Sequence, residues 1–197
     1  MLEAGRYSEA VELLKDSVFD EKGHPLLKSQ YLYYYAIALM GEERYSTAEP
    51  LLDAAVHAQK TADYLSFSLA ECLLSQHKEA KRAFDLLEQV RINLTKNSGS
   101  NQHRLRLAQC NAISAWSLAA CGRREEAETR LREALAEPDS FSKDELAGLL
   151  NSKGSVLREL GDSEGSRAGF EQALAVFPYG STAIFARRSL TQLLEGV

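Results

Sequence analysis

Histidine, cysteine and serine are among the residues of this chain that could bind a metal or support catalysis. Four histidines stand alone in the sequence: His24, His57, His77 and His103. No two of them have the HxxxH spacing that places two imidazoles on one face of a helix. The chain also lacks a CxxC pair, a GxxxxGK[ST] phosphate loop and a GxGxxG motif. We therefore expect no metal, no cofactor and no enzymatic activity.

One serine-lysine spacing matches a hydrolase pattern only in its letters. Ser140 precedes Lys143 in the order S-x-x-K, but both lie in a predicted linker after Pro138. Ser142 and Glu145 have the spacing of a capping box, which satisfies open backbone N–H groups at a helix start. We expect helix capping here and no catalytic site.

Composition and charge limit the partners and the compartment. The 197 residues are 45% hydrophobic and 26% charged, which is typical of a globular chain, and the net charge of -5 argues against a nucleic-acid backbone as partner. No apolar run approaches the roughly 18 residues of a membrane span, and the first ten residues do not resemble a signal peptide. The three cysteines, Cys72, Cys110 and Cys121, are odd in number and lie in helical patterns. We expect a reducing compartment, the cytoplasm or alternatively the nucleus.

The stretch from residue 149 to residue 178 predicts two helices joined by a tight turn. Apolar and small residues recur at helical spacing in both halves: Leu150, Gly154 and Leu157, then Ser166, Phe170, Ala173 and Leu174. Gly161 ends the first helix, Asp162 can cap the second, and Pro178 stops it. The small Gly154 lets the two backbones approach, and Phe170 fills the space beside it.

This order of small residue, Leu, Gly-Asp turn, small residue, Phe, Ala and Pro resembles the tetratricopeptide repeat (TPR), a unit of about 34 residues. The small residue of the second helix recurs along the chain at five anchors: Ala10, Ala48, Ala80, Ala127 and Ser166. The turn before Ala80 looks about two residues short for the family. The resemblance implies an all-α, right-handed helix-turn-helix solenoid of TPR-like repeats with a C-terminal capping helix.

The repeats predict a single TPR-like domain over residues 1–197. It comprises a partial repeat at 1–25, complete repeats at about 28–58, 61–96, 103–138 and 143–178, and a capping helix at 181–195. The partial repeat lacks its first helix.

The resemblance implies a non-catalytic protein-protein interaction scaffold that binds a peptide or helix of a partner. In this family the first helices of successive repeats line a concave groove. The small crossing residues of these helices are Ala36, Ala70, Ala115 and Gly154. Groove positions lie three before and one after each: Tyr33, Ile37, Phe67, Glu71, Ala112, Trp116, Asn151 and Ser155. We expect Tyr33, Ile37, Phe67 and Trp116 to face water and to bind the partner, with Glu71 and Asn151 beside them.

Two questions stay open at this point. The run at 31–35 contains four tyrosines and is apolar nearly all round, so these rings belong either to the groove or to the core, because one helix cannot aim all four at a groove. The function also has alternatives in other classes. These are a structural subunit packing laterally in a large assembly such as a ubiquitin-ligase complex, and a regulatory TPR domain of a larger protein. A reader of C-terminal carboxylates is disfavoured, because Asn151 alone is of the residue type that such readers use.

Two surfaces complete the predictions. Without the first helix of its repeat, the segment at 5–19 should present an uncovered apolar strip of Tyr7, Ala10, Leu13 and Leu14. A second copy of the chain, a different subunit or an upstream helix lost by truncation could cover this strip. The first choice is a homodimer through this N-terminal edge, formed by Tyr7, Leu13 and Leu14. Six arginines interleave with glutamates, and a solvated helix surface is preferred over a patch that binds an acidic partner: Arg104, Arg106, Arg123, Arg124, Arg130 and Arg132.

Overall fold

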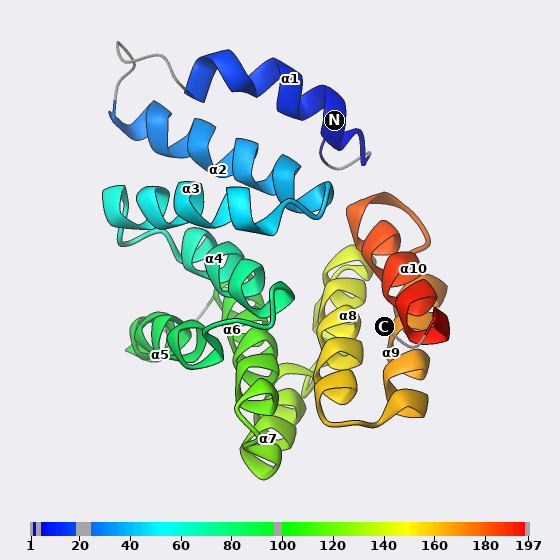
Figure 1. Ribbon diagram of the computed structural model, residues 1–197. Helices are drawn as coiled ribbons and strands as arrows, with labels where there is room; N and C mark the ends of the chain where they lie inside the picture. Colours follow the sequence, from blue (N-terminus) through cyan, green and yellow to red (C-terminus); the bar gives the residue numbers. More distant parts are fainter. Residues whose placement is uncertain (1, 3–4, 19–24, 97–99, 196–197) are drawn as a thin grey trace. The chain divides into compact units, whose positions relative to one another are not determined.

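The computed structural model describes residues 2, 5–18, 25–96 and 100–195, and every element in these ranges is a helix (Figure 1). The predicted all-α fold is therefore confirmed. The α-helices are α1 (Tyr7–Val18), α2 (Pro25–Gly41), α3 (Tyr45–Ala58), α4 (Asp63–Ser75), α5 (Ala80–Lys96), α6 (Asn101–Ala120), α7 (Arg124–Ala134), α8 (Lys143–Glu159), α9 (Ser163–Val176) and α10 (Gly180–Glu195). A short 3₁₀ turn, Pro138–Ser140, precedes α8.

The chain divides into two compact units, Met1–Glu79 and Ala80–Val197. The first unit contains α1 to α4, in which each helix packs on the next along the chain. The second unit contains α5 to α10, with helix pairs α6/α7 and α8/α9 and with α10 packed on α8 and α9. The boundary falls between the two helices of the repeat predicted at 61–96. The single domain over residues 1–197 stays a prediction.

The same turn ends α2, α4, α6 and α8. A residue in the left-handed conformation follows each helix: Glu43 (φ 61°), His77 (φ 53°), Gly122 (φ 73°) and Gly161 (φ 78°). After α6, the N–H of Gly122 donates to the Ala119 carbonyl at 2.9 Å and the N–H of Arg123 donates to the Leu118 carbonyl at 2.9 Å. These two bonds define a Schellman motif, which satisfies carbonyls that the helix end leaves open.

The turn sets a common register for the four preceding helices. Seven positions before it stand the small residues Ala36, Ala70, Ala115 and Gly154, and all four are buried. The sequence prediction of these crossing residues is therefore confirmed. Glu43 and His77 adopt a conformation that glycine favours, so the turn after α2 and the turn after α4 carry backbone strain that the other two avoid.

The second helices of the pairs bury residues at i, i+4 and i+7. In α3 these are Ala48, Leu52 and Ala55, which are fully buried. In α5 they are Ala83, Leu87 and Val90, and not a set that starts at Ala80.

The predicted anchor Ala80 is therefore wrong. Ala80 is the first residue of α5 and is half-buried, whereas Ala83 is fully buried. The turn before it contains two left-handed residues, His77 and Glu79, so it is longer than the sequence pattern indicated.

Helices α8 and α9 of the second unit cross at close range. A Cβ atom on Gly154 would lie 2.7 Å from the ring of Phe170, and one on Gly169 would lie 3.0 Å from the Gly154 backbone. Phe170 is fully buried, and its ring also packs edge-on to that of Phe185 of α10 with centroids 6.2 Å apart. The predicted interior role of Phe170 is confirmed.

The predicted helix caps of this pair are present. Ser142 and Glu145 form the capping box at the start of α8. Asp162 accepts a 2.8 Å hydrogen bond from the N–H of Gly165 at the start of α9. These caps satisfy backbone N–H groups that would otherwise lack intrahelical partners.

One part of the arginine surface has a structural role. Arg130 of α7 donates to Glu88 of α5 at 3.1 Å, and both side chains are only 20% exposed. Arg91 donates to the same carboxylate at 2.8 Å, and the guanidinium of Arg123 lies 5.1 Å from the ring centroid of Phe84. The interpretation as a purely solvated surface is therefore wrong for Arg130, which links α7 to α5.

Candidate functional site

The groove positions predicted in the second unit are occupied by contacts within the chain. Trp116 is only 4% exposed, and its Nε1–H donates to a carboxylate oxygen of Glu159 at 3.3 Å. Asn151 is 6% exposed, and its side-chain N–H donates to the Thr182 carbonyl at the start of α10 at 2.8 Å. Ala112 and Ser155 are also buried. The expectation that Trp116 faces water is wrong, because α6 packs on α8 at this position. Partner binding by Trp116 and Asn151 stays a prediction.

The groove positions predicted in the first unit are more accessible. Tyr33, Ile37 and Glu71 are half-buried, and Phe67 is buried. The expectation that Phe67 faces water is therefore wrong, because most of α4 is buried and Phe67 is among its buried residues. Partner binding by Tyr33, Ile37, Phe67 and Glu71 stays a prediction.

Three tyrosine rings from α2 and α4 are in contact. The ring of Tyr33 lies 4.9 Å from that of Tyr64, centroid to centroid and edge to face, and 5.1 Å from that of Tyr34. Tyr34 is 48% exposed and Tyr64 is 38% exposed. We call the surface formed by Tyr33, Tyr34, Ile37, Tyr64 and Glu71 the α2–α4 face.

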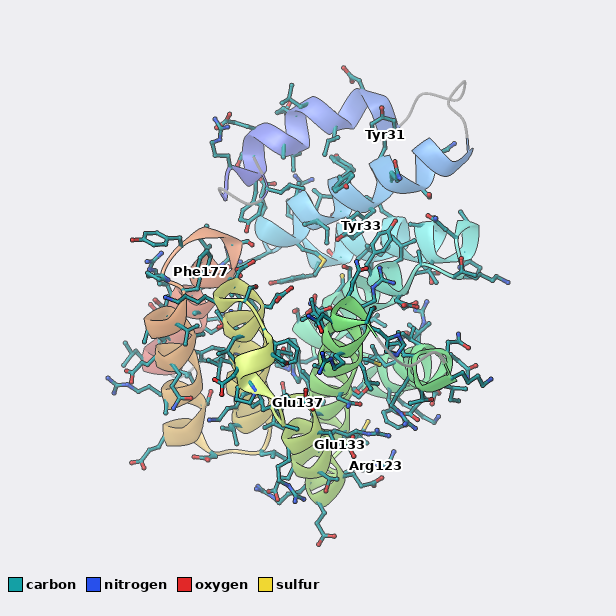
Figure 2. All side chains as sticks on the ribbon, turned by 180° about the vertical axis from the view of Figure 1, so that it is seen from behind. Tyr31, Tyr33, Arg123, Glu133, Glu137 and Phe177 are labelled. Carbon is teal, nitrogen blue, oxygen red and sulfur yellow. The ribbon has the colours of Figure 1, made fainter. Side chains whose placement is uncertain are left out.

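The tyrosine run of α2 serves both surface and core. Tyr35 is buried, whereas Tyr31 and Tyr34 are exposed. Figure 2 labels Tyr31 and Tyr33, which lie on different sides of α2, as residues two positions apart must. The core interpretation is therefore confirmed for Tyr35, and membership of the other rings in a groove stays a prediction.

The α4 part of this face was only partly visible in the sequence. Phe67 and Glu71 were predicted, and Tyr64 was missed. The spacing Tyr64, Phe67, Glu71 is i, i+3, i+7, which places all three on one side of a helix, so this periodicity could have revealed it.

The electrostatic environment of the face is dominated by desolvation. Burial raises the pKa of the Glu71 carboxyl to about 7. Burial also raises the pKa of Tyr33, while a hydrogen bond with the Ser68 hydroxyl opposes that rise and the nearby Glu71 adds to it. Within the described part of the chain, the Glu71 carboxylate has no hydrogen-bond or ion-pair partner. The face therefore combines apolar rings with one uncompensated acidic group.

The N-terminal edge is largely covered by the chain itself. The ring of Tyr7 lies directly against Gly41 of α2, and the Ser8 hydroxyl donates to Glu42 at 2.6 Å. Ala10 is only 4% exposed, so the predicted uncovered strip is wrong at this position, because α1 packs along α2 and covers the small methyl group.

Two leucines of the predicted edge remain at the surface. Leu13 is 62% exposed and Leu14 is half-buried. A homodimer through this edge stays a prediction. Leu13 and Leu14 are the apolar side chains of the predicted edge that remain available for its contact.

Among the described residues there is neither a metal site nor a membrane-spanning helix. In those residues, no group of three or more His, Cys, Asp or Glu side chains is arranged to hold a metal ion. None of the described helices is long and apolar enough to cross a membrane.

The fold is that of a helical repeat protein built from antiparallel helix pairs. A crystal structure described as a thermophilic TPR protein of Thermus thermophilus is similar to this chain, with a TM-score of 0.52 and 21% sequence identity. The similarity covers 96% of this chain and 92% of that one. The chain therefore has the tetratricopeptide repeat fold. No protein-family model and no curated protein sequence matches it.

Proposed function

We propose that this chain is a non-catalytic scaffold that binds an α-helix or an extended peptide of a partner protein on the α2–α4 face. The observation that carries the proposal is the contact among Tyr33, Tyr34 and Tyr64, with Tyr34 and Tyr64 more than one third exposed. Tyrosine offers a rigid ring and a polar hydroxyl, and exposed clusters of this kind frequently anchor protein partners. The TPR fold supports the scaffold class.

The proposed site contains none of the groove residues that the sequence predicted in the second unit. Trp116 and Asn151 already have partners inside the chain, so they are left out of the site. Tyr33, Ile37 and Glu71 are kept, with Tyr34 and Tyr64 added, and Phe67 is left out because it is buried. A structural subunit of a large assembly and a regulatory domain of a larger protein remain the alternatives.

The experiment is affinity capture from native lysate followed by quantitative mass spectrometry, using the wild-type chain and the double change Tyr34→Ala, Tyr64→Ala. Both rings are partly exposed, so their loss should leave the fold intact. The matched control is Tyr31→Ala, because Tyr31 has the same 38% exposure as Tyr64 and also lies on α2 with Tyr34. We expect a partner that the double variant loses and Tyr31→Ala retains.

Equal capture by all three proteins would contradict binding on this face. Loss of partner only after changes in an end helix such as α10 would instead favour lateral packing in an assembly. Circular dichroism of each variant verifies that the helices are unchanged.

We also propose a reducing compartment, the cytoplasm or the nucleus. Cys72, Cys110 and Cys121 are unbridged, and Cys72 and Cys110 are buried, which raises the pKa of each thiol to about 12. Fractionation of cells that express the tagged full-length protein tests this proposal. Recovery in an oxidising compartment would contradict it.

A further inference from the structure

The acidic charge of this chain is concentrated in the first unit. Met1–Glu79 contains 13 acidic and seven basic residues, a formal net charge of -6, whereas Ala80–Val197 contains 15 acidic and 16 basic residues, a net charge of +1. The whole-chain value of -5 therefore comes from the unit that carries the α2–α4 face.

The helices around the face have few positive charges of their own. Lys28 is the one Lys or Arg in the segments that form α2, α3 and α4, which also contain Glu49, Asp53, Asp63 and Glu71. Lys28 stands near the start of α2, five positions before Tyr33. An incoming cation would therefore meet little repulsion at the face.

Glu71 is the group on this face whose charge lacks compensation. Its carboxyl group has no hydrogen-bond or ion-pair partner in the described part of the chain, and it lies near Tyr33, whose pKa it helps to raise. A buried charge is costly unless it is paired. A cation that pairs with Glu71 would remove this cost.

The tyrosine rings favour the same kind of ligand. An aromatic face is the negative part of the ring quadrupole and attracts ammonium and guanidinium groups. Lys and Arg also have long apolar stems, which can pack along Tyr33 and Tyr64 while the charged end reaches a carboxylate.

We propose that the α2–α4 face binds a basic, apolar peptide segment, in which a Lys or Arg pairs with Glu71 and neighbouring apolar side chains pack on Tyr34, Tyr64 and Ile37. This inference rests on the proposed function and adds the chemistry of the partner. The opposite preference, for an acidic peptide or a free C-terminal carboxylate, would place like charges together at Glu71.

The test is selection from a displayed library of random 12-residue peptides, with the full-length chain as bait. Three variants are compared with the wild type: Glu71→Gln, Glu12→Gln and the double change Tyr34→Ala, Tyr64→Ala. Glu12 is an exposed residue of α1, so its change also removes one acidic group, but from a helix that does not form the α2–α4 face. We expect wild type and Glu12→Gln to select peptides rich in Lys or Arg beside apolar residues.

For a selected basic peptide, Glu71→Gln should weaken binding about tenfold, as loss of a close charge pair does at other interfaces. Glu12→Gln should change it less than twofold. Selected peptides that are neutral or acidic, or a Glu71→Gln variant that binds basic peptides as the wild type does, would overturn the inference.

The two proposals fail in different ways. If the peptides are not basic but binding still requires Tyr34 and Tyr64, the α2–α4 face stands and the partner chemistry is wrong. If binding is unaffected by the double tyrosine change, or if no peptide is selected, both proposals are overturned.

Discussion

The crossing of α8 and α9 allows a stability prediction with a control in the same helix. Gly154 and Gly148 both lie in α8, and alanine has a higher helix propensity than glycine by about 1 kcal/mol. A Cβ on Gly148 would meet nothing within 4 Å, whereas a Cβ on Gly154 would lie 2.7–2.8 Å from three ring atoms of Phe170. Phe170 is fully buried, and its ring also packs against that of Phe185.

The two alanine changes should therefore have opposite effects. Gly148→Ala should stabilise the second unit by about 0.5–1 kcal/mol, from helix propensity alone. Gly154→Ala gains the same propensity but overpacks the crossing, which typically costs about 1–3 kcal/mol, so we expect a net loss of about 1–2 kcal/mol.

The assay is urea denaturation followed by tryptophan fluorescence. Trp116 is the single tryptophan of the chain and lies in the same unit as the crossing, packed against α8, so its emission reports this unit. A second change, Phe170→Leu, removes the ring that meets the new methyl group, and the cost of the double variant should be less than the sum of the single costs. Gly154→Ala at least as stable as Gly148→Ala would refute the packing described for this crossing.

Three further predictions concern single positions. Ser166 has a buried hydroxyl with no hydrogen-bond partner among the described residues. The other second helices have alanine at this position, Ala48, Ala83 and Ala127, which carries no polar group. Ser166→Ala should raise the free energy of unfolding by about 1 kcal/mol in the same urea assay, and a loss would show that the hydroxyl has a partner. The raised pKa of Glu71 means that the folded state holds its proton from about pH 4.5 to 7 while the unfolded state releases it, so stability should fall across this range, by at most about 3 kcal/mol. Thermal melts at pH 5 and pH 8 should show this fall in wild type and a smaller one in Glu71→Gln; equal falls would contradict the burial of this carboxyl. If the N-terminal edge forms a homodimer, light scattering should give a dimer for wild type and a monomer for Leu13→Glu, and a wild-type monomer would exclude that edge.

Much of the fold was predictable because its main determinants are local. The small crossing residues and the turn residues stand at a constant separation, as with Ala115 and Gly122, and Gly154 and Gly161. The helix caps at Ser142 and Asp162 likewise depend on residues within three positions.

The sequence predictions failed where contacts between residues far apart in the chain determine the structure. Ala80 and Ala83 both fit a helical pattern, and the extra left-handed residue of the preceding turn, Glu79, selects between them. Trp116 stands at a groove position in its own helix, but Glu159 of another helix accepts its N–H bond and α8 buries it. No periodicity within one helix contains that information.

The α2–α4 face shows the same limit of prediction from sequence. Tyr33 and Glu71 were found from the register of single helices, whereas the contact of Tyr33 with Tyr64 depends on how α2 and α4 pack. The lack of a partner for the Glu71 carboxylate is likewise a property of the folded unit, because it depends on every helix around it.

The most direct test of the central claim is photocrosslinking from the α2–α4 face. A photoreactive phenylalanine analogue is placed at position 34, position 64 or, as the control, position 31 of the full-length chain, and the protein is irradiated in native lysate or with a selected basic peptide. The account predicts one common crosslinked partner from positions 34 and 64, and its absence from position 31. Equal crosslinking from all three positions, or crosslinking from position 31 alone, would contradict binding on this face.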